Sequence, residues 1–301
     1  MTKAVLYHGL RPLVVGLSWL PLWMLYGLAD VLFLVSFHLF RYRRRVVQQN
    51  LRNAFPDRSA AERARIERAF FRHFCDVIVE TVKLLSMREA DLRKRVRVEG
   101  LETVAPLAEQ GRSAFVASSH LGNWEWMGAA MAQKVGLEVA AVYKSLADPY
   151  WDRFMYDMRS RFGLKLIPMR DALRDLMARR STPSLIALLA DQTPFPEDGH
   201  WMTFLNQETP VYRGVALGAR MLDYPLLYAG MQRTRRGHYR VRLEMLVERP
   251  RELGEGEILE RYMRRLEQDI LAQPESWLWS HRRWKHQRPP ELSSQPSRKA
   301  G

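Results

Sequence analysis

The sequence predicts an α/β protein, with a mixed, mostly parallel sheet flanked by helices and a hydrophobic N-terminal membrane helix in front of it. Three observations support this prediction: a long apolar run near the N-terminus, helical spacing up to about residue 95, and short β-rich runs that then alternate with helical segments. The chain has 301 residues, of which 47% are hydrophobic, and can therefore bury a substantial core.

An apolar run extends over residues 13–40 and ends at a basic cluster, residues 41–45, which holds four arginines. A helix that crosses a bilayer needs about 20 mainly apolar residues, so the run is long enough. Pro21 interrupts it, which predicts a tilted, kinked or partly interfacial helix. The basic flank, Trp19 and Trp23 favour membrane attachment over a buried core helix, and the positive-inside rule places the rest of the chain on the cytoplasmic side.

Helical spacing of apolar residues continues over residues 46–95, with a break at a Pro-Asp turn. Ser59, followed three residues later by Glu62, predicts a capping box at the start of the longest helix. His73 and Cys75 fall inside this helix, and we expect both to be packing residues, because a lone pair of this kind does not make a metal site.

After residue 95 the pattern changes to short β-rich runs separated by helical segments, which indicates a sheet with crossover helices. The predicted strands lie within residues 96–100, 113–120, 138–144, 164–169, 184–191, 225–234 and 239–246. The clearest helical segments between them are residues 148–162 and 171–180.

These boundaries predict three parts of the chain. Residues 1–45 form the membrane-attachment segment, and residues 46–288 form one folded domain that is helical up to residue 95 and α/β from 96 to 288. The Pro, Ser and Lys composition of residues 289–301 predicts a disordered tail.

The charge balance predicts an anionic partner, because the net charge is +14 and the sequence pI is about 10.2. Nucleic acid, anionic lipid and an acidic carrier protein would each fit. Nine tryptophans and fourteen methionines are more typical of proteins at a membrane interface than of DNA-binding proteins. We therefore expect the protein to bind a membrane and not nucleic acid. The single cysteine, Cys75, excludes an intrachain disulfide and paired-thiolate zinc sites.

The most informative segment is residues 115–125, where an apolar strand enters a glycine-containing turn and a helix begins near Trp124. Four residues separate His120 from Glu125, so the carboxylate can reach the imidazole, fix its tautomer and make a general base. The alternative is that His120 caps the helix and Glu125 neutralises its dipole. The nucleophile motif GxSxG is missing, so the chemistry needs no covalent acyl-enzyme.

HLGNWE matches the motif of glycerolipid acyltransferases, in which four residues separate a histidine from an acidic residue. Its particular residues resemble those of the lauroyl and myristoyl transferases of lipid A biosynthesis. Further blocks resemble that family in the same order along residues 40–288: RYRRRVVQQNLRNAFP, VYKSLADPYWDRFMYDMRSRFG, LLADQT and PESWLWSHRRWKHQRP. The last block mixes tryptophans with basic residues, which would serve base stacking or anchoring at an anionic membrane, and the N-terminal apolar run favours the membrane.

The resemblance implies that His120 is the base and that Glu125 supports it. It also implies an arginine that binds substrate phosphate or developing charge, and both Arg159 and Arg161 match that position. Asp191, after an apolar strand, would orient the acceptor sugar or this arginine, with a cap or turn residue as the alternative.

Two further residues are candidates for substrate binding. Lys144 would contact an anionic head group or carrier phosphate, although a solvated surface lysine fits equally well. Asn123 lies inside the HLGNWE motif. The stretch 190–214 departs from the commoner family pattern by extra Pro and His residues, which predicts a remodelled loop, and we expect His200 to have a structural role in that loop.

The function that the resemblance implies is transfer of a fatty acyl chain from acyl carrier protein, or coenzyme A, to a hydroxyl of a lipid A precursor. It would take place in a ternary complex on the cytoplasmic side of the bacterial inner membrane, with no metal or cofactor. The alternatives are acylation of another lipid, such as a phosphoinositide mannoside, an ornithine lipid or a glycerophospholipid, and a non-catalytic membrane protein that binds anionic lipid.

Overall fold

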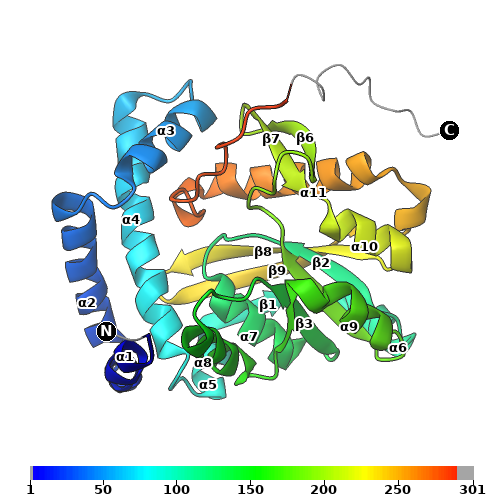
Figure 1. The fold of residues 1–301 in the computed structure, drawn as a ribbon, viewed down its shortest axis with the longest axis horizontal. Coiled ribbons are helices and arrows are strands. Elements are labelled where there is room, and N and C mark those ends of the chain that lie inside the picture. The colour runs from blue at the N-terminus through cyan, green and yellow to red at the C-terminus, as the bar shows by residue number, and fades with distance from the viewer. Residues whose placement is uncertain (1–2, 290–301) are drawn as a thin grey trace.

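Seven strands form the central sheet of the computed structural model, which describes residues 3–289, in the order β1-β9-β8-β2-β5-β3-β4 (Figure 1). Their bounds are β1 (Val96–Glu99), β2 (Ala114–Ser118), β3 (Glu138–Tyr143), β4 (Lys165–Pro168), β5 (Ser184–Leu189), β8 (Leu226–Arg235) and β9 (His238–Val247). All seven predicted strands are present, and only the β8–β9 pair is antiparallel within this sheet. The predicted mixed, mostly parallel sheet is confirmed.

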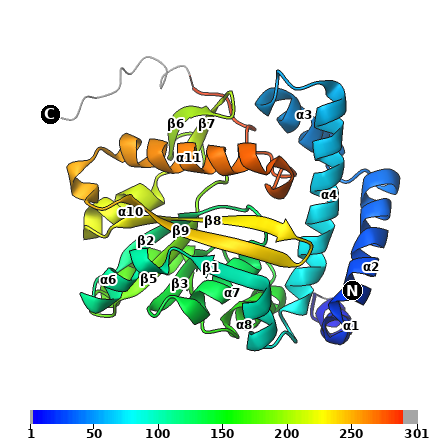
Figure 2. The same ribbon diagram turned by 180° about the vertical axis from the view of Figure 1, so that it is seen from behind.

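Helices cover both faces of the sheet, and Figure 2 shows the same layers from behind. Alternation along β2 explains this arrangement, because successive strand side chains point to opposite faces. Phe115 and Ala117 pack in one core with α10 (Gly214–Leu222) and α11 (Glu255–Ala272). Ala114 and Val116 pack in the other core with α7 (Trp124–Lys134).

Six further α-helices precede or connect these strands. They are α3 (Arg44–Ala54), α4 (Ala60–Lys83), α5 (Glu89–Arg95), α6 (Ala105–Glu109), α8 (Pro149–Ser160) and α9 (Ala172–Ala178). The capping box at the start of α4 is confirmed, since the Ser59 side chain accepts from the Glu62 backbone and the Glu62 carboxylate accepts from the Ser59 N–H. His73 and Cys75 are both buried in α4, as expected.

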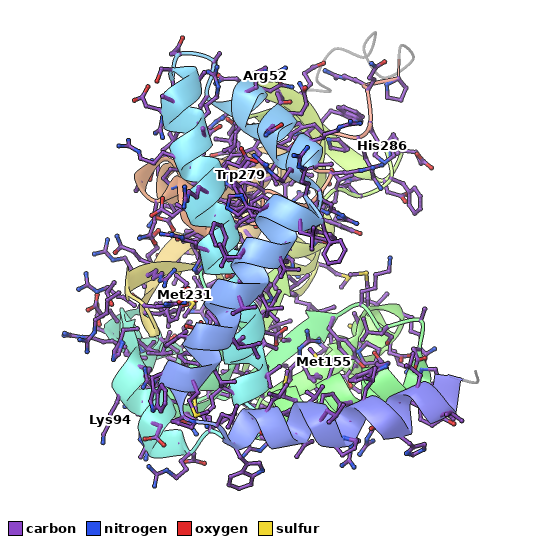
Figure 3. The ribbon with its side chains drawn as sticks, turned by 90° about the vertical axis from the view of Figure 1, so that its left-hand side faces the viewer. Arg52, Lys94, Met155, Met231, Trp279 and His286 are labelled. Atoms are coloured by element: carbon purple, nitrogen blue, oxygen red, sulfur yellow. The ribbon has the colours of Figure 1, made fainter. Side chains whose placement is uncertain are left out.

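The N-terminal apolar run forms two helices rather than one. Helix α1 (Lys3–Trp19) ends before Pro21, and α2 (Leu22–Leu34) follows and continues as a π-helix (Val35–Leu39). Proline lacks the backbone N–H that would continue the first helix, so the chain turns there. Figure 3 shows the two helices running in different directions across the side of the molecule that faces the viewer.

The segment Leu22–Leu39 is long and apolar enough to cross a membrane by length and composition, with a mean hydropathy of 1.7. Only 22% of this segment is buried inside the protein, which distinguishes it from the core helix of a soluble domain. Trp19 and Trp23 are each 73% exposed. The predicted N-terminal apolar helix is therefore present, and its outer surface has no cover within the described part of the chain.

The stretch 190–214 contains a hairpin that the sequence does not predict. Strands β6 (Gly199–Phe204) and β7 (Gln207–Tyr212) pair in antiparallel fashion through a two-residue turn in which Leu205 and Asn206 both have positive φ. His200 therefore lies in a strand and not in a loop. The predicted tail, 289–301, falls outside the described residues except for Pro289.

Candidate active site

The turn after β2 carries His120 to the carboxyl end of the parallel strands, where α/β folds place ligands. Gly122 adopts a φ of +66°, and a Cβ at this position would lie 3.1 Å from the Met231 carbonyl oxygen. A side chain there would be strained both by the backbone and by its neighbour. The glycine that the sequence shows within HLGNWE is therefore required by the sharp turn that presents His120.

Strand register brings His120 to Asp191. Ser118 of β2 is aligned with Leu189 of β5, so the residues two positions further along each strand lie side by side. His120 Nδ1 lies 2.7 Å from one Asp191 oxygen, and the His120 backbone N–H donates to the other at 2.9 Å. The imidazole is thus held at two points by one carboxylate.

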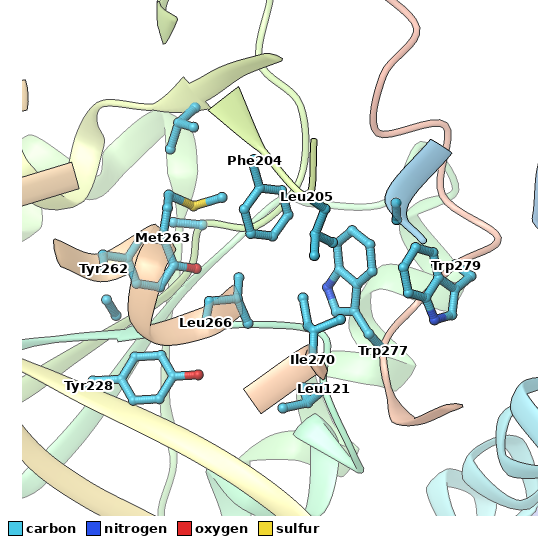
Figure 4. Close-up of a cluster of buried hydrophobic side chains, with 14 of the residues drawn as sticks. Leu121, Phe204, Leu205, Tyr228, Tyr262, Met263, Leu266, Ile270, Trp277 and Trp279 are labelled. Atoms are coloured by element: carbon cyan, nitrogen blue, oxygen red, sulfur yellow. The ribbon is translucent and has the colours of Figure 1, made fainter. Parts of the chain in front are cut away.

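Asp191 is itself fixed by the C-terminal segment. The Trp277 indole N–H donates to Asp191 Oδ2 at 2.9 Å, and Trp277 packs among Leu121 and other buried apolar side chains in Figure 4. Burial raises the pKa of Asp191, but the charge of His120 and the hydrogen bonds from His120 and Trp277 outweigh burial and hold the pKa below its usual value. Asp191 is therefore an ionised acceptor at neutral pH.

An ionised Asp191 determines the tautomer of His120. Nδ1 carries the proton that it donates to the carboxylate, which leaves Nε2 with a free lone pair. The Gln192 amide nitrogen lies 3.3 Å from this Nε2 and donates to it. The base-plus-carboxylate arrangement is the one expected of a general base, with Nε2 as the atom that accepts a proton.

Glu125 does not make the expected contact with the imidazole. Its carboxylate instead accepts two hydrogen bonds from Arg159 of α8, from Nε at 2.8 Å and from Nη2 at 2.6 Å. Asp191 takes the place that the sequence spacing suggested for Glu125. Burial lowers the pKa of Arg159, but the hydrogen bonds and charge of Glu125 raise it more, so that the pKa lies above its usual value.

The structure separates the two candidate arginines. Arg161, directly after the end of α8, donates to the backbone carbonyl oxygens of Leu84 and Met87 and makes no contact with Glu125 among the described residues. Arg159 lines the cavity next to His120 and uses Nε and Nη2 for Glu125, which leaves Nη1 without a partner among residues 3–289. Arg159 is thus the arginine that the fold brings to the site.

The other two candidates differ in their surroundings. Lys144 is exposed and lines the same cavity as His120. Asn123 is fully buried, and its side chain caps α7 by accepting from the Trp126 N–H at 3.0 Å. The structure therefore does not bring Asn123 into the cavity, because its polar atoms are used inside the protein.

Helix α4 contributes two polar side chains to the support of this turn. The sequence predicts only a packing role for His73, and no sequence pattern points to Glu80. The His73 Nε2–H donates to the Gly122 carbonyl oxygen at 3.2 Å, and the Glu80 carboxylate accepts from the Asn123 amide at 2.7 Å. Glu80 also accepts from the hydroxyls of Tyr26 in α2 and Tyr239 in β9. No local pattern could reveal these contacts, since each joins residues more than 40 positions apart.

Two of the motif blocks meet beside this turn. The Asn50 side-chain amide in α3 donates to the backbone carbonyl oxygens of Trp279 and His281, at 2.9 and 3.0 Å. Leu121 forms a bridge with Trp277, and the Gly122 N–H donates to the Ser276 carbonyl oxygen at 2.9 Å. Blocks that are distant in sequence therefore support one turn.

A cavity of about 530 Å³ begins at His120 and Glu125 and extends between α7 and strands β2 to β5. Its exposed lip includes Leu146 and Met169, each about half exposed. Its inner wall is apolar and buried, and is formed by Val116, Met127, Met131, Val139, Leu164 and Leu166. The cavity can therefore hold a hydrocarbon chain with its polar end beside the imidazole.

Taken together, the fold and this site define an α/β protein that holds a histidine–aspartate pair beside an apolar cavity. Among residues 3–289, no group of three or more His, Cys, Asp or Glu side chains is placed to hold a metal ion.

Comparisons with known proteins agree with this class. Residues 12–286 match the bacterial lipid A biosynthesis acyltransferase family, and the chain belongs to that family. It is similar to the lipid A biosynthesis palmitoleoyltransferase of Escherichia coli (strain K12), with 24% identity over 248 residues that cover 81% of this chain and 79% of the relative. A lipid A biosynthesis acyltransferase of Shigella flexneri matches with the same identity and coverage. The protein is an acyltransferase.

Proposed function

We propose that this protein transfers a fatty acyl chain from acyl carrier protein to a hydroxyl of a lipid A precursor, with His120 as the general base. The observation that supports the proposal most directly is the His120–Asp191 pair at the mouth of an apolar cavity. A base at the polar end of a hydrocarbon-sized pocket is the arrangement that acyl transfer to a hydroxyl needs.

The reaction proceeds in a ternary complex. His120 Nε2 takes the proton of the acceptor hydroxyl as the oxygen attacks the thioester carbonyl, and the ionised Asp191 stabilises the imidazolium that forms. The new carbon–oxygen bond forms, the carbon–sulfur bond breaks, and the departing thiolate takes the proton from His120. The hydrogen bond from Gln192 gives way to the acceptor hydroxyl at the start of this sequence.

Arg159 and Lys144 supply the positive charge at the cavity mouth. The Glu125 carboxylate fixes the guanidinium plane of Arg159, and Nη1 remains for a substrate phosphate or for the negative oxygen of the transition state. Lys144 would contact the carrier phosphate or the acceptor head group. Both substrates are acidic, which fits the net charge of +14.

We place the protein at the bacterial inner membrane, with its site on the cytoplasmic side. The exposed apolar surfaces of α1 and α2 support attachment, and the arginines directly after the π-helix support a cytoplasmic orientation. Because α2 packs along α4, we favour attachment in the plane of the interface over a helix that spans the bilayer alone.

The test is transfer of a labelled acyl chain from acyl carrier protein to a Kdo-lipid A precursor, with full-length protein purified in detergent. The His120→Ala and Glu125→Ala variants are expected to lose transfer while their thermal unfolding stays cooperative. His238→Ala removes a half-buried histidine of the β8–β9 hairpin that does not line the cavity, and serves as the control. Activity that survives in His120→Ala would exclude the mechanism.

The same assay separates the alternatives. Transfer from acyl coenzyme A but not from the carrier protein would identify acyl coenzyme A as the donor. Wild-type activity on another lipid hydroxyl, with none on the lipid A precursor, would change the acceptor while leaving the chemistry intact.

A further inference from the structure

A second cavity, of about 740 Å³, lies between α2, α4 and the turn of the β8–β9 hairpin. Figure 2 shows this hairpin reaching α4 next to α2. The cavity is separate from the one beside His120, although β8 runs parallel to β2 and both His120 and the hairpin turn follow the carboxyl ends of these strands. None of its lining residues belongs to the site described above.

Arginines dominate the polar lining of this cavity. Arg233 and Arg236 of the hairpin share the buried carboxylate of Asp76, at 2.7 and 2.6 Å, and Arg236 also pairs with Asp30 at 2.7 Å. These pairs fasten the hairpin to α4 and α2. Two lining carboxylates are therefore already engaged, and Glu275 is the third.

Two further arginines in the lining have no carboxylate partner within residues 3–289. The Arg72 guanidinium lies 5.1 Å from the centre of the Phe33 ring, and Arg235 donates only to His238 Nε2 at 3.1 Å. Both side chains are exposed and keep N–H groups for an anion. Arg68, one turn before Arg72 in α4, adds positive charge beside the same ring.

The cavity also has an apolar edge. Leu34 of α2 belongs to its lining and is 54% exposed, and Val31, one turn earlier, is equally exposed. A ligand that satisfies both surfaces must join an anionic group to a hydrocarbon chain. Membrane phospholipids have this chemistry, and arginine suits their phosphates because its planar fork binds two oxygens at once.

We propose that this cavity binds the phosphate of an anionic phospholipid from the membrane that α2 contacts, with Arg72 and Arg235 as its direct partners. The acyl chains of that lipid lie along Leu34 and Val31. The proposal rests on the membrane attachment in the proposed function and adds a lipid site that is separate from both substrates. A bound phosphate would explain why α2, which carries few charges, lies beside two arginines that have no carboxylate partner among residues 3–289.

The experiment is co-sedimentation of the full-length protein with phosphatidylcholine vesicles that contain or lack phosphatidylglycerol. The Arg72→Gln/Arg235→Gln double variant is expected to lose about 10- to 30-fold in affinity for the anionic vesicles, since each arginine near an anionic surface contributes about 1 kcal/mol and 1.4 kcal/mol is tenfold. Arg249→Gln/Arg261→Gln removes the same charge from the exposed surface around α11 and is expected to change affinity less than about threefold.

Each outcome decides one point. Equal losses in the two double variants would overturn the specific site, because only net charge would then matter. Release of the protein by inorganic phosphate at constant ionic strength would assign the cavity to a soluble phosphate and also overturn the proposal. Failure of the wild-type protein to sediment with either kind of vesicle would instead refute the membrane attachment itself. Acyl transfer in detergent is expected to be unchanged in the Arg72→Gln/Arg235→Gln variant.

Discussion

At the scale of single residues, Asp191 is the side chain that holds the His120 imidazole, and the proposed general-base role of His120 depends on it. Asp191 accepts hydrogen bonds from the imidazole, from the His120 backbone and from Trp277, so it fixes both the position and the tautomer of the imidazole. A neutral amide in its place could not stabilise an imidazolium, and it would offer a donor where Nδ1–H needs an acceptor.

The Asp191→Asn variant is therefore expected to lower kcat by about 10²- to 10⁴-fold while KM changes little, since a well-placed base contributes about that much. Steady-state kinetics over a range of acceptor concentrations measure both constants. Asp198→Asn, which removes an exposed carboxylate from the same connection, is the matched control. A rise in KM without loss of kcat would show that Asp191 binds substrate and does not orient the base.

Arg159 and Arg161 lie two residues apart and make different contacts in this structure. Arg159→Met is expected to reduce kcat/KM by about 100-fold, as removal of one charge-stabilising donor typically does, with little change in melting temperature. Arg161→Met leaves two backbone carbonyls of the α4–α5 connection without their donor and is expected to cost about 1–3 kcal/mol of stability at nearly normal kcat/KM. Calorimetry and kinetics on both variants check this, and the reverse pattern would exchange their roles.

His73 predicts a dependence of stability on pH. Burial, and then the Arg233 charge, lower its pKa from 6.5 to about 3. The unfolded chain therefore binds a proton that the folded protein excludes between these values, so the free energy of unfolding falls as the pH drops through this window. His281, whose burial lowers its pKa to about 4, acts in the same direction.

We expect His73 alone to remove about 2 kcal/mol between pH 8 and pH 5, at about 1.4 kcal/mol per pH unit below the pKa of the unfolded chain. His73→Gln can keep a donor for Gly122 and an acceptor for Arg233 but does not titrate, so its stability should fall less over the same range. Urea unfolding in detergent at the two pH values measures the difference. Parallel pH profiles for the two proteins would contradict this origin.

At the scale of elements, α4 joins the N-terminal helices to the His120 turn. Glu80 is fully buried, and its three hydrogen bonds reach α2, β9 and the cap of α7. Burial raises its pKa and outweighs those hydrogen bonds, which lower it. A single acceptor inside the core thus holds three elements in register.

Replacing that acceptor should affect the turn as well as the fold. Glu80→Ala leaves the Asn123 amide and two tyrosine hydroxyls unpaired, which is expected to cost about 3 kcal/mol and to lower kcat, because Asn123 caps the helix after His120. Glu80→Gln retains a carbonyl oxygen and should recover at least half of both losses. Melting temperatures and kcat are measured together, and a loss of stability at full kcat would limit Glu80 to a structural role.

The sequence predicts the strands of the parallel part of the sheet. It does not predict contacts that depend on which distant segments pair with each other. The apolar runs ending at His120 and Asp191 predict both residues at strand ends, yet 71 positions separate them in sequence. Only the knowledge that β2 and β5 are neighbours could have predicted their contact. The β6–β7 hairpin is missed because prolines obscure its alternation, although Asn206 in a two-residue connection was an available turn signal.

At the scale of the whole molecule, the apolar surfaces of α1 and α2 form one side of the protein (Figure 3). A Trp23→Ser/Val31→Ser variant is expected to bind neutral phosphatidylcholine vesicles at least tenfold more weakly, since burial of each large apolar side chain contributes about 1.5–3 kcal/mol. Leu217→Ser/Leu271→Ser alters two large apolar side chains outside these helices, which are 44% and 49% exposed, and should bind normally. Equal binding of both variants, measured by flotation, would move the contact surface elsewhere.

The break at Pro21 has a further consequence for how the protein can be divided. Because the chain turns there, α1 passes beside α8, where Tyr7 stacks on Tyr150 at 5.3 Å, while α2 places Tyr26 on Glu80. The N-terminal helices thus complete the interior of the folding unit as well as its outer surface. A chain shortened to begin at residue 46, or one in which an unrelated anchor replaces the first 45 residues, would lack the contacts that α1 makes with the helix of Arg159 and that α2 makes with Glu80, which supports the His120 turn.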